Sequence, residues 1–315
     1  MPRLYARLNI ESDFQGRYPW QSHRIDVGGG IRQAVVDEGP RAAPVTFVLL
    51  HGNPTWGFLY RKFVAELAND YRVVVPDHVG FGRSDKPRDP TYYSLDRHIA
   101  NLTITLEQLN VSRAVLVMQD WGGPIGMGWG TRHADRVAGF VVMNTWAFVE
   151  QPPLKLPWLF KFLVLGKGGW KRATQSNLFT EMFLIRGSKL DDVTAAAYRA
   201  PHAAPEDRVG IARFPQLIPE TANLAHESRR TMAAIERALP SIADRPALLI
   251  WAAKDRAFNA AQLDRWRTLF RNLDGPHLVP AAGHFLQEDA PNEILPRLRE
   301  WADAQFRGTN ARRPR

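Results

Sequence analysis

One acidic residue, Asp120, lies where an apolar strand is predicted to turn sharply into a helix. The stretch "VLVMQ" (115–119) is typical of a buried strand, and "WGGPIGMGWG" (121–130) is typical of a helix that packs closely on a sheet. This is the context of a nucleophile elbow, with Asp in the nucleophile position and Met118 in place of the usual first small residue. Considered alone, Asp120 is better explained as a helix cap, which is a common role for Asp.

Two further residues favour catalysis over capping. His284 follows the last predicted strand in "AAGHFLQEDAP", and Asp255 ends "LLIWAAKD", 29 residues earlier. That interval is about one strand–helix–strand step, so Asp255 can hold one ring nitrogen of His284 while the other faces Asp120. The three residues also occur in the chain order nucleophile, acid, base. We therefore predict that Asp120 is the nucleophile, Asp255 the acid and His284 the base.

The order of predicted elements indicates how these residues are brought together. Apolar runs rich in β-branched residues alternate with amphipathic stretches, which is typical of an α/β fold with a mostly parallel sheet flanked by helices. A glycine turn within 21–36 adds a predicted antiparallel hairpin at one sheet edge. In open sheets of this kind ligands bind beyond the carboxyl ends of the strands, where the three residues are predicted to lie.

The alternation stops between about 147 and 225, in a segment rich in proline, aromatic residues and short helical pieces. We interpret 147–225 as a helical cap domain inserted over the carboxyl edge of the sheet, with Trp158 and Trp170 packing inside it. The main domain is then formed by 1–146 and 226–306. The last residues, 307–315, are predicted to be a disordered basic tail.

Composition narrows the chemistry and the partners. The 315 residues include no cysteine, which excludes disulfides, thiolate metal sites and a cysteine nucleophile. The net charge of +9 comes mainly from dispersed arginines, so we expect neither a nucleic-acid partner nor a membrane partner. No apolar run approaches the roughly 20 residues of a membrane span, and the first residues do not have the pattern of a secretory signal. A cytoplasmic location is the expectation.

Several motifs together resemble a known family. They are "HGNPTWGFLYR" (51–61), "VVVPDHVGFGRSDKP" (73–87), "VMQDWGGPIG" (117–126), "YRAP" (198–201), "KD" (254–255) and "GHFLQED" (283–289). Through them the chain resembles the haloalkane dehalogenase family of the α/β-hydrolase fold, over roughly Arg24 to Phe306. HGNPTW combined with QDWGG is the most specific part of the match, and the predicted cap is the weakest.

The resemblance implies a reaction and a role for each residue. Asp120 would displace halide from a haloalkane and form an alkyl ester, which water activated by His284 would hydrolyse to an alcohol. The indole N–H of Trp121 and the side-chain amide of Asn53 would bind the halide, since both are neutral donors. The backbone N–H groups of Asn53 and Trp121 would form the oxyanion hole. Neither a metal nor an organic cofactor is implied.

Two departures place the chain within that family. One subfamily has a glutamate as the acid after the strand that ends near 143, but "VVMNTW" has Asn144 there, which leaves Asp255 as the acid. Another subfamily binds halide with a tryptophan from the cap, and the corresponding stretch "NLFTEMFLIRG" has none. The chain thus resembles a third grouping within the family. Members of that grouping are often large oligomers, and by this analogy alone we expect a homo-oligomer.

Related reactions remain as alternatives. An epoxide hydrolase shares the Asp–His–Asp logic but normally uses two cap tyrosines as acids, and the predicted cap contains only Tyr198. A haloacetate dehalogenase would need arginines after the nucleophile, where this chain has Trp121 and two glycines. Two alternatives belong to other functional classes: a small-molecule receptor and a luciferase-like relative, each with the same fold.

Overall fold

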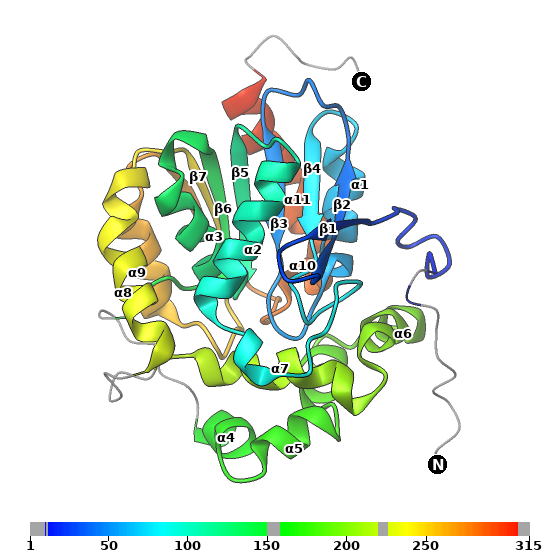
Figure 1. Cartoon of the computed structure of the whole chain (residues 1–315). Helices are drawn as coiled ribbons and strands as arrows, with labels where there is room; N and C mark the ends of the chain where they lie inside the picture. Colours follow the sequence, from blue (N-terminus) through cyan, green and yellow to red (C-terminus); the bar gives the residue numbers. More distant parts are fainter. Residues whose placement is uncertain (1–9, 11, 150–157, 220–225, 308–315) are drawn as a thin grey trace.

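The computed structural model describes residue 10 and residues 12–149, 158–219 and 226–307. Its centre is an eight-stranded sheet in the order β1-β2-β4-β3-β5-β6-β7-β8 (Figure 1). The pairings β1 with β2 and β2 with β4 are antiparallel, and all others are parallel. The predicted α/β class and the predicted edge hairpin are therefore both confirmed. The strands are β1 (His23–Asp26), β2 (Arg32–Glu38), β3 (Thr46–Leu50), β4 (Arg72–Pro76), β5 (Ala114–Asp120), β6 (Val137–Thr145), β7 (Ala247–Ala252) and β8 (Leu273–Val279).

Helices cover both faces of the sheet. On one face α1 packs against α11, and on the other α3 packs against both α2 and α8. The central strands β3 and β4 are buried along their whole length, as expected for parallel strands with helices on both sides. The helices are α1 (Arg61–Leu67), α2 (Leu95–Gln108), α3 (Gly122–Arg132), α4 (Trp158–Phe160), α5 (Gly169–Thr174), α6 (Asp192–Arg199), α7 (Val209–Arg213), α8 (Glu227–Ala238), α9 (Ala260–Leu269), α10 (Leu286–Asp289) and α11 (Pro291–Phe306).

The segment that interrupts the α/β alternation forms a separate helical layer. Figure 1 shows α4, α5, α6 and α7 together beyond one end of the sheet strands. Two hydrogen bonds join this layer to the loop after β3: the Trp56 indole donates to the carbonyl of Ala197 (3.2 Å), and the Asn53 amide donates to that of Ile211 (3.3 Å). The layer therefore lies against the carboxyl edge of the sheet. We call 158–217 the helical layer; the boundaries at 147 and 225 stay predictions.

Two local predictions differ from the structure. Trp158 and Trp170 were expected to pack inside the cap, but both side chains are exposed on it, because the buried positions of this layer are taken by other apolar residues such as Val164 and Phe179. The sequence segment 276–284 was expected to hold the last strand, but that strand begins earlier, at Leu273, and ends at Val279. Of the predicted disordered tail 307–315, Arg307 is described and forms an ion pair with Asp70 (2.9 Å), and the remainder lies outside the described residues. Within the described ranges, no helix has the length and apolarity needed to cross a bilayer.

Candidate active site

Asp120 occupies a strained turn at the carboxyl end of β5. Its φ is 51°, a left-handed value that is costly for a residue other than glycine, and α3 begins two residues later. The neighbouring loop passes so close that a Cβ at Gly52 would overlap the Asp120 carboxylate. The strand and the helix thus hold this carboxylate at the tip of the turn, where the elbow pattern predicted it.

The structure brings the three predicted catalytic residues together. Nε2 of His284 lies 3.6 Å from Oδ2 of Asp120, and Nδ1 of the same ring lies 2.9 Å from Oδ2 of Asp255. The Asp255 side chain is completely buried, and its other oxygen accepts the backbone N–H of Ala257 (2.7 Å). His284 is therefore held between two carboxylates, with Nδ1 donating to Asp255 and Nε2 facing Asp120.

The two oxygens of Asp120 have different surroundings. Oδ1 accepts the backbone N–H of Asn53 (2.7 Å), and the backbone N–H of Trp121 also donates to the carboxylate. These are the two donors predicted to form the oxyanion hole, and in the free protein they hold the carboxylate itself. Oδ2 faces His284 and is the oxygen left for attack on a substrate.

Burial and charge have opposite effects on the two central groups. Burial raises the pKa of Asp120, although His284 and the two backbone donors oppose that shift. For His284 burial favours the neutral ring, but the charge and hydrogen bond of Asp255 and the charge of Asp120 outweigh it and raise the pKa to about 9. In the free protein the two neighbouring carboxyl groups therefore favour the protonated form of the His284 ring.

Two amide side chains support this arrangement. Gln119, fully buried beside the nucleophile, donates from Nε2 to the His284 carbonyl (3.1 Å) and places the same nitrogen 3.2 Å from His284 Nε2. Asn144 donates to Oδ2 of Asp255 (2.9 Å) and accepts the N–H of Ala252 (2.7 Å). The two positions considered for the catalytic acid are thus hydrogen-bonded neighbours. Gln119 had no role in the sequence analysis, although it belongs to the QDWGG motif.

The predicted halide donors lie beside the nucleophile. The Trp121 indole N–H has no hydrogen-bond partner among the described residues, and its ring is almost completely buried. Asn53 donates one amide hydrogen to the Ile211 carbonyl, which leaves a second hydrogen on Nδ2, and its Oδ1 is buried without a partner. Both side chains can therefore donate to an anion that leaves from a carbon next to Asp120.

Aromatic rings surround these groups. The ring centroid of Trp121 lies 4.9 Å from that of Trp146 and 5.2 Å from that of Phe214, while Phe258 stacks 5.6 Å from the His284 ring. The sequence analysis did not predict that Phe214 or Phe258 lies at the site. Phe258 could have been found, because it stands three residues after the predicted acid; Phe214 has no such neighbour in the sequence. These aromatic surroundings suit an apolar substrate.

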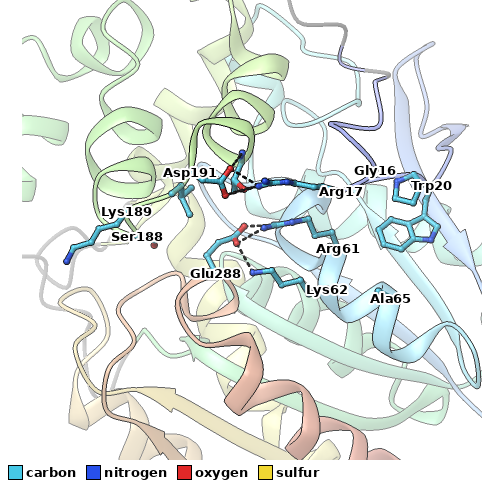
Figure 2. A pocket seen from close by; sticks show the side chains of 13 residues that line it. Gly16, Arg17, Trp20, Arg61, Lys62, Ala65, Ser188, Lys189, Asp191 and Glu288 are labelled. Atoms are coloured by element: carbon cyan, nitrogen blue, oxygen red, sulfur yellow. Dashed lines mark hydrogen bonds and ion pairs between the residues drawn. The ribbon is translucent and has the colours of Figure 1, made fainter.

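A charged cluster next to the site fixes the segment that carries His284. Glu288 accepts hydrogen bonds from Arg61 (2.8 Å to Nη2) and Lys62 (3.3 Å) (Figure 2). It also accepts one from the hydroxyl of Tyr198 (2.6 Å), which belongs to the helical layer. Burial and the Glu288 charge raise the pKa of Tyr198 well above its usual value. The cluster borders an open pocket of about 590 Å³, to which none of the three predicted catalytic residues contributes.

Comparison with known proteins agrees with this geometry. The α/β-hydrolase fold family matches residues 45–291. The chain is 33% identical to a cis-3-alkyl-4-alkyloxetan-2-one decarboxylase of Xanthomonas campestris over 299 residues, 91% of this chain and 97% of the relative. It is 35% identical to haloalkane dehalogenase 2 of Mycobacterium bovis over 286 residues, 88% and 93% of the two chains. The crystal structure of haloalkane dehalogenase DbeA from Bradyrhizobium elkani superposes with a TM-score of 0.80 at 25% identity, covering 90% of this chain and 98% of the other.

These matches show that the protein is an enzyme with the α/β-hydrolase fold. Within that fold the chain belongs to the haloalkane dehalogenase family.

Proposed function

We propose that the protein is a haloalkane dehalogenase, which converts a haloalkane and water to an alcohol and a halide ion. The observation that carries the proposal is the placement of Asp120 Oδ2 opposite His284, with the unpartnered indole N–H of Trp121 next to it. A carboxylate can attack an sp³ carbon without first losing a proton, and an anion leaving that carbon needs neutral donors in an apolar site.

In the first step Oδ2 of Asp120 forms a bond to the halogenated carbon while the carbon–halogen bond breaks. The halide takes the bonding electrons and is stabilised by Trp121 Nε1 and Asn53 Nδ2. Oδ1 becomes the carbonyl oxygen of the ester and keeps its bond to the Asn53 N–H, which spans 2.7 Å in the free protein. No donor has to move for this step, so the site is preorganised for alkylation.

The second step explains why His284 is poised between two carboxylates. Esterification removes the negative charge of Asp120, one of the charges that raise the pKa of His284 to about 9 in the free protein. The pKa of His284 must therefore fall on alkylation, which makes the neutral base accessible when it is needed to deprotonate water. The resulting hydroxide attacks the ester carbonyl, and the tetrahedral oxygen is stabilised in the oxyanion hole.

The test is halide release from 1-bromobutane and 1,3-diiodopropane by the wild type, Asp120→Asn and His284→Ala. We expect Asp120→Asn to lose about 10⁴-fold or more of the activity. His284→Ala should release one equivalent of halide and then stop, with the mass of the alkyl group added at Asp120. Sustained halide release by Asp120→Asn would remove the proposed nucleophile.

A second candidate function, decarboxylation of a β-lactone, is supported by relatives. The chain is 33% identical to the decarboxylase of Xanthomonas campestris and 31% identical to that of Shewanella oneidensis. With such a substrate Oδ2 of Asp120 would attack ring carbon 4 and release the ring oxygen as a carboxylate. Carbon dioxide would then leave carbon 3, its electrons forming the alkene while the bond to Asp120 breaks. This sequence needs neither water nor a base.

The two functions differ in what they require of His284. Hydrolysis of an alkyl ester needs His284 to activate water, whereas elimination returns the Asp120 carboxylate directly. With a cis-3,4-dialkyloxetan-2-one, alkene and carbon dioxide formed by the wild type and still formed by His284→Ala would assign the decarboxylase. Absence of both products, beside catalytic halide release from 1-bromobutane, would leave the dehalogenase.

The epoxide hydrolase alternative is disfavoured by the surroundings of Tyr198. Its hydroxyl donates to Glu288 (2.6 Å), and its pKa lies well above the usual value, so this side chain is a poor acid for an epoxide oxygen. Styrene oxide should therefore not be hydrolysed under conditions in which 1-bromobutane is.

A further inference from the structure

The outer side of the helical layer exposes large apolar side chains. Trp158 is 77% and Phe162 is 64% exposed, and three more apolar side chains of the same layer are exposed as well: Leu159, Trp170 and Met182. Among the described residues of the remaining chain, only Leu278 is a large apolar side chain with comparable exposure. Contiguous exposed apolar surface is uncommon on soluble proteins and usually marks a contact site.

The segments that carry four of these side chains, Trp158, Leu159, Phe162 and Trp170, are joined to one another. Trp158 and Leu159 belong to α4, which continues into the π-helical turn Lys161–Leu165 that carries Phe162. Arg172 of α5 donates to the carbonyl of Phe162 (2.9 Å) and lies 5.9 Å from its ring, which fixes α5, with Trp170, beside this turn. Figure 1 shows α4 and α5 on the side of the layer that faces away from the sheet.

The charges on the layer between 158 and 189 are almost entirely positive. Five basic residues in that range are exposed: Lys161, Lys167, Lys171, Arg186 and Lys189. The range contains one acidic residue, Glu181, and both of its oxygens are bound by Arg199 (2.7 Å each). Within 158–189, exposed tryptophan and phenylalanine therefore occur together with basic residues and without a free carboxylate.

We propose that this face of the helical layer, named the apolar face and defined by Trp158, Leu159, Phe162 and Trp170, docks on the surface of an anionic lipid membrane, contrary to the expectation drawn from the dispersed arginines. Tryptophan and phenylalanine insert at the headgroup level, and each Lys or Arg near an anionic leaflet adds about 1 kcal/mol of attraction. A second copy of this chain is a poorer partner, because a two-fold contact through this face would bring the basic residues of both copies together.

Docking in this orientation has a consequence for catalysis, which rests on the proposed function. The helical layer lies against the carboxyl edge of the sheet, where Asn53 bonds to Ile211, so the predicted active site is on the inner side of the layer that would touch lipid. Haloalkanes and alkyl lactones partition into lipid. The bound enzyme would meet its substrate where the substrate is concentrated.

The test is co-sedimentation of the full-length protein with vesicles of phosphatidylcholine alone and of phosphatidylcholine with 30% phosphatidylglycerol. We expect at least ~10-fold stronger partition to the anionic vesicles, decreasing with added salt. Trp158→Ser combined with Phe162→Ser should weaken it at least ~10-fold. The matched control is Leu278→Ser, which removes the exposed apolar side chain outside the layer and should leave binding unchanged.

The same double variant keeps every basic residue, including those of 307–315, so it separates the apolar face from charge attraction elsewhere on the chain. The control for folding is thermal unfolding: a double variant that unfolds at the same midpoint temperature as the wild type has retained the fold. Equal partition of wild type and double variant, or no preference for anionic vesicles, overturns the proposal. A wild-type dimer in sedimentation that becomes monomeric in the double variant, without vesicle binding, assigns the face to a second copy instead. Halide release measured without lipid tests the proposed function separately.

Discussion

Histidines are buried in two regions of this molecule, and their pKa values are shifted in opposite directions in the two regions. At the active site, His284 lies between Asp255 and Asp120, and those carboxylates raise its pKa to about 9. Beside the site, four buried histidines lie near one another, and no carboxylate of the described residues contacts them: His51, His78, His98 and His202. Burial lowers the pKa of all four, to about 4 for His78 and about 3 for His202. We call these four the histidine cluster.

The two regions are neighbours, which makes the difference informative. The ring of Phe214 lies 4.7 Å from that of His98 and 5.2 Å from that of Trp121, so one side chain separates the cluster from the predicted halide donor. Burial alone disfavours the imidazolium in both places. Whether a buried histidine of this protein is charged at neutral pH is therefore decided by its carboxylate partners, rather than by the residue type or the extent of burial.

The largest expected effect comes from removing the carboxylate that distinguishes His284. Asp255→Asn leaves the ring without its negative partner and places an amide opposite Nδ1, so the pKa of His284 should fall toward the values of the histidine cluster. Ester hydrolysis should slow by about 10³-fold or more, and alkyl-enzyme should accumulate during turnover of 1-bromobutane. Mass spectrometry of the quenched reaction and the pH dependence of halide release measure both effects.

The matched control for that variant is Asp274→Asn. Asp274 also binds a histidine, His277 (2.7 Å), but at the surface and away from the site, so this variant should keep wild-type activity. Alkyl-enzyme that fails to accumulate in Asp255→Asn would mean that another group is the acid. Asn144, hydrogen-bonded to Asp255, allows a relocation: Asn144→Glu with Asp255→Ala should recover part of the hydrolysis if the acid can act from either position.

A smaller effect is expected on stability in mild acid. The unfolded state protonates a histidine near pH 6.5, whereas the folded state resists protonation of His78 down to about 4 and of His202 down to about 3. Their contribution to stability is therefore complete above pH 6.5 and is lost as the pH falls, at about 1.4 kcal/mol per pH unit for each. The free energy of unfolding in urea should drop by several kcal/mol between pH 6.5 and 4.5.

The contribution of His284 to stability depends on pH in the opposite direction. Its folded-state pKa of about 9 lies above the unfolded value, so its contribution is complete below pH 6.5 and is lost as the pH rises through 9. Carboxylates with lowered pKa, such as Asp37 and Asp96, lose their contributions at still lower pH, below the range of the test. His202→Phe should reduce the acid slope by about 1.4 kcal/mol per pH unit; an unchanged slope would assign the loss to other groups.

The smallest expected effect is a gain in stability at neutral pH. Both ring nitrogens of His98 are buried without a partner, which costs about 1–3 kcal/mol of desolvation, and the ring packs on Phe214. His98→Phe should therefore raise the free energy of unfolding by about 1 kcal/mol at pH 7. His78→Phe is the contrasting variant: it removes hydrogen bonding to the His51 carbonyl (2.9 Å) and should destabilise the fold. Urea unfolding that ranks the two variants in the reverse order would contradict this account.

Much of the fold and the arrangement at the predicted site followed from local patterns. The apolar run before Asp120 and the glycines after it indicated a strand, a turn and a helix, and the structure has β5, a left-handed turn and α3 there. Asp255 and His284 were predicted from their positions after strands, because the carboxyl ends of parallel strands meet at one edge of a sheet. Their catalytic roles stay predictions until the variants are measured.

Other residues of the site had no comparable local signal. Phe214 reaches Trp121 from the helical layer, where the sequence pattern is weakest, and Gln119 reaches His284 across 165 residues of sequence. The exposure of Trp158 was not predicted either, because an aromatic residue in a helical segment has the same local pattern whether it packs inside or faces outward. Which side is covered depends on neighbours that are distant in the chain.

The sequence by itself determined the alternation of strands and helices, the elbow at Asp120 and the order of the residues proposed for catalysis, because each of these depends on a few neighbouring residues and on the period of the apolar pattern. Only the tertiary structure decided which histidines meet a carboxylate and which meet one another. The residues of the histidine cluster stand in separate segments of the chain, and charge and burial act through space rather than along the chain. The opposite pKa shifts of His284 and the histidine cluster are therefore a property of the folded protein.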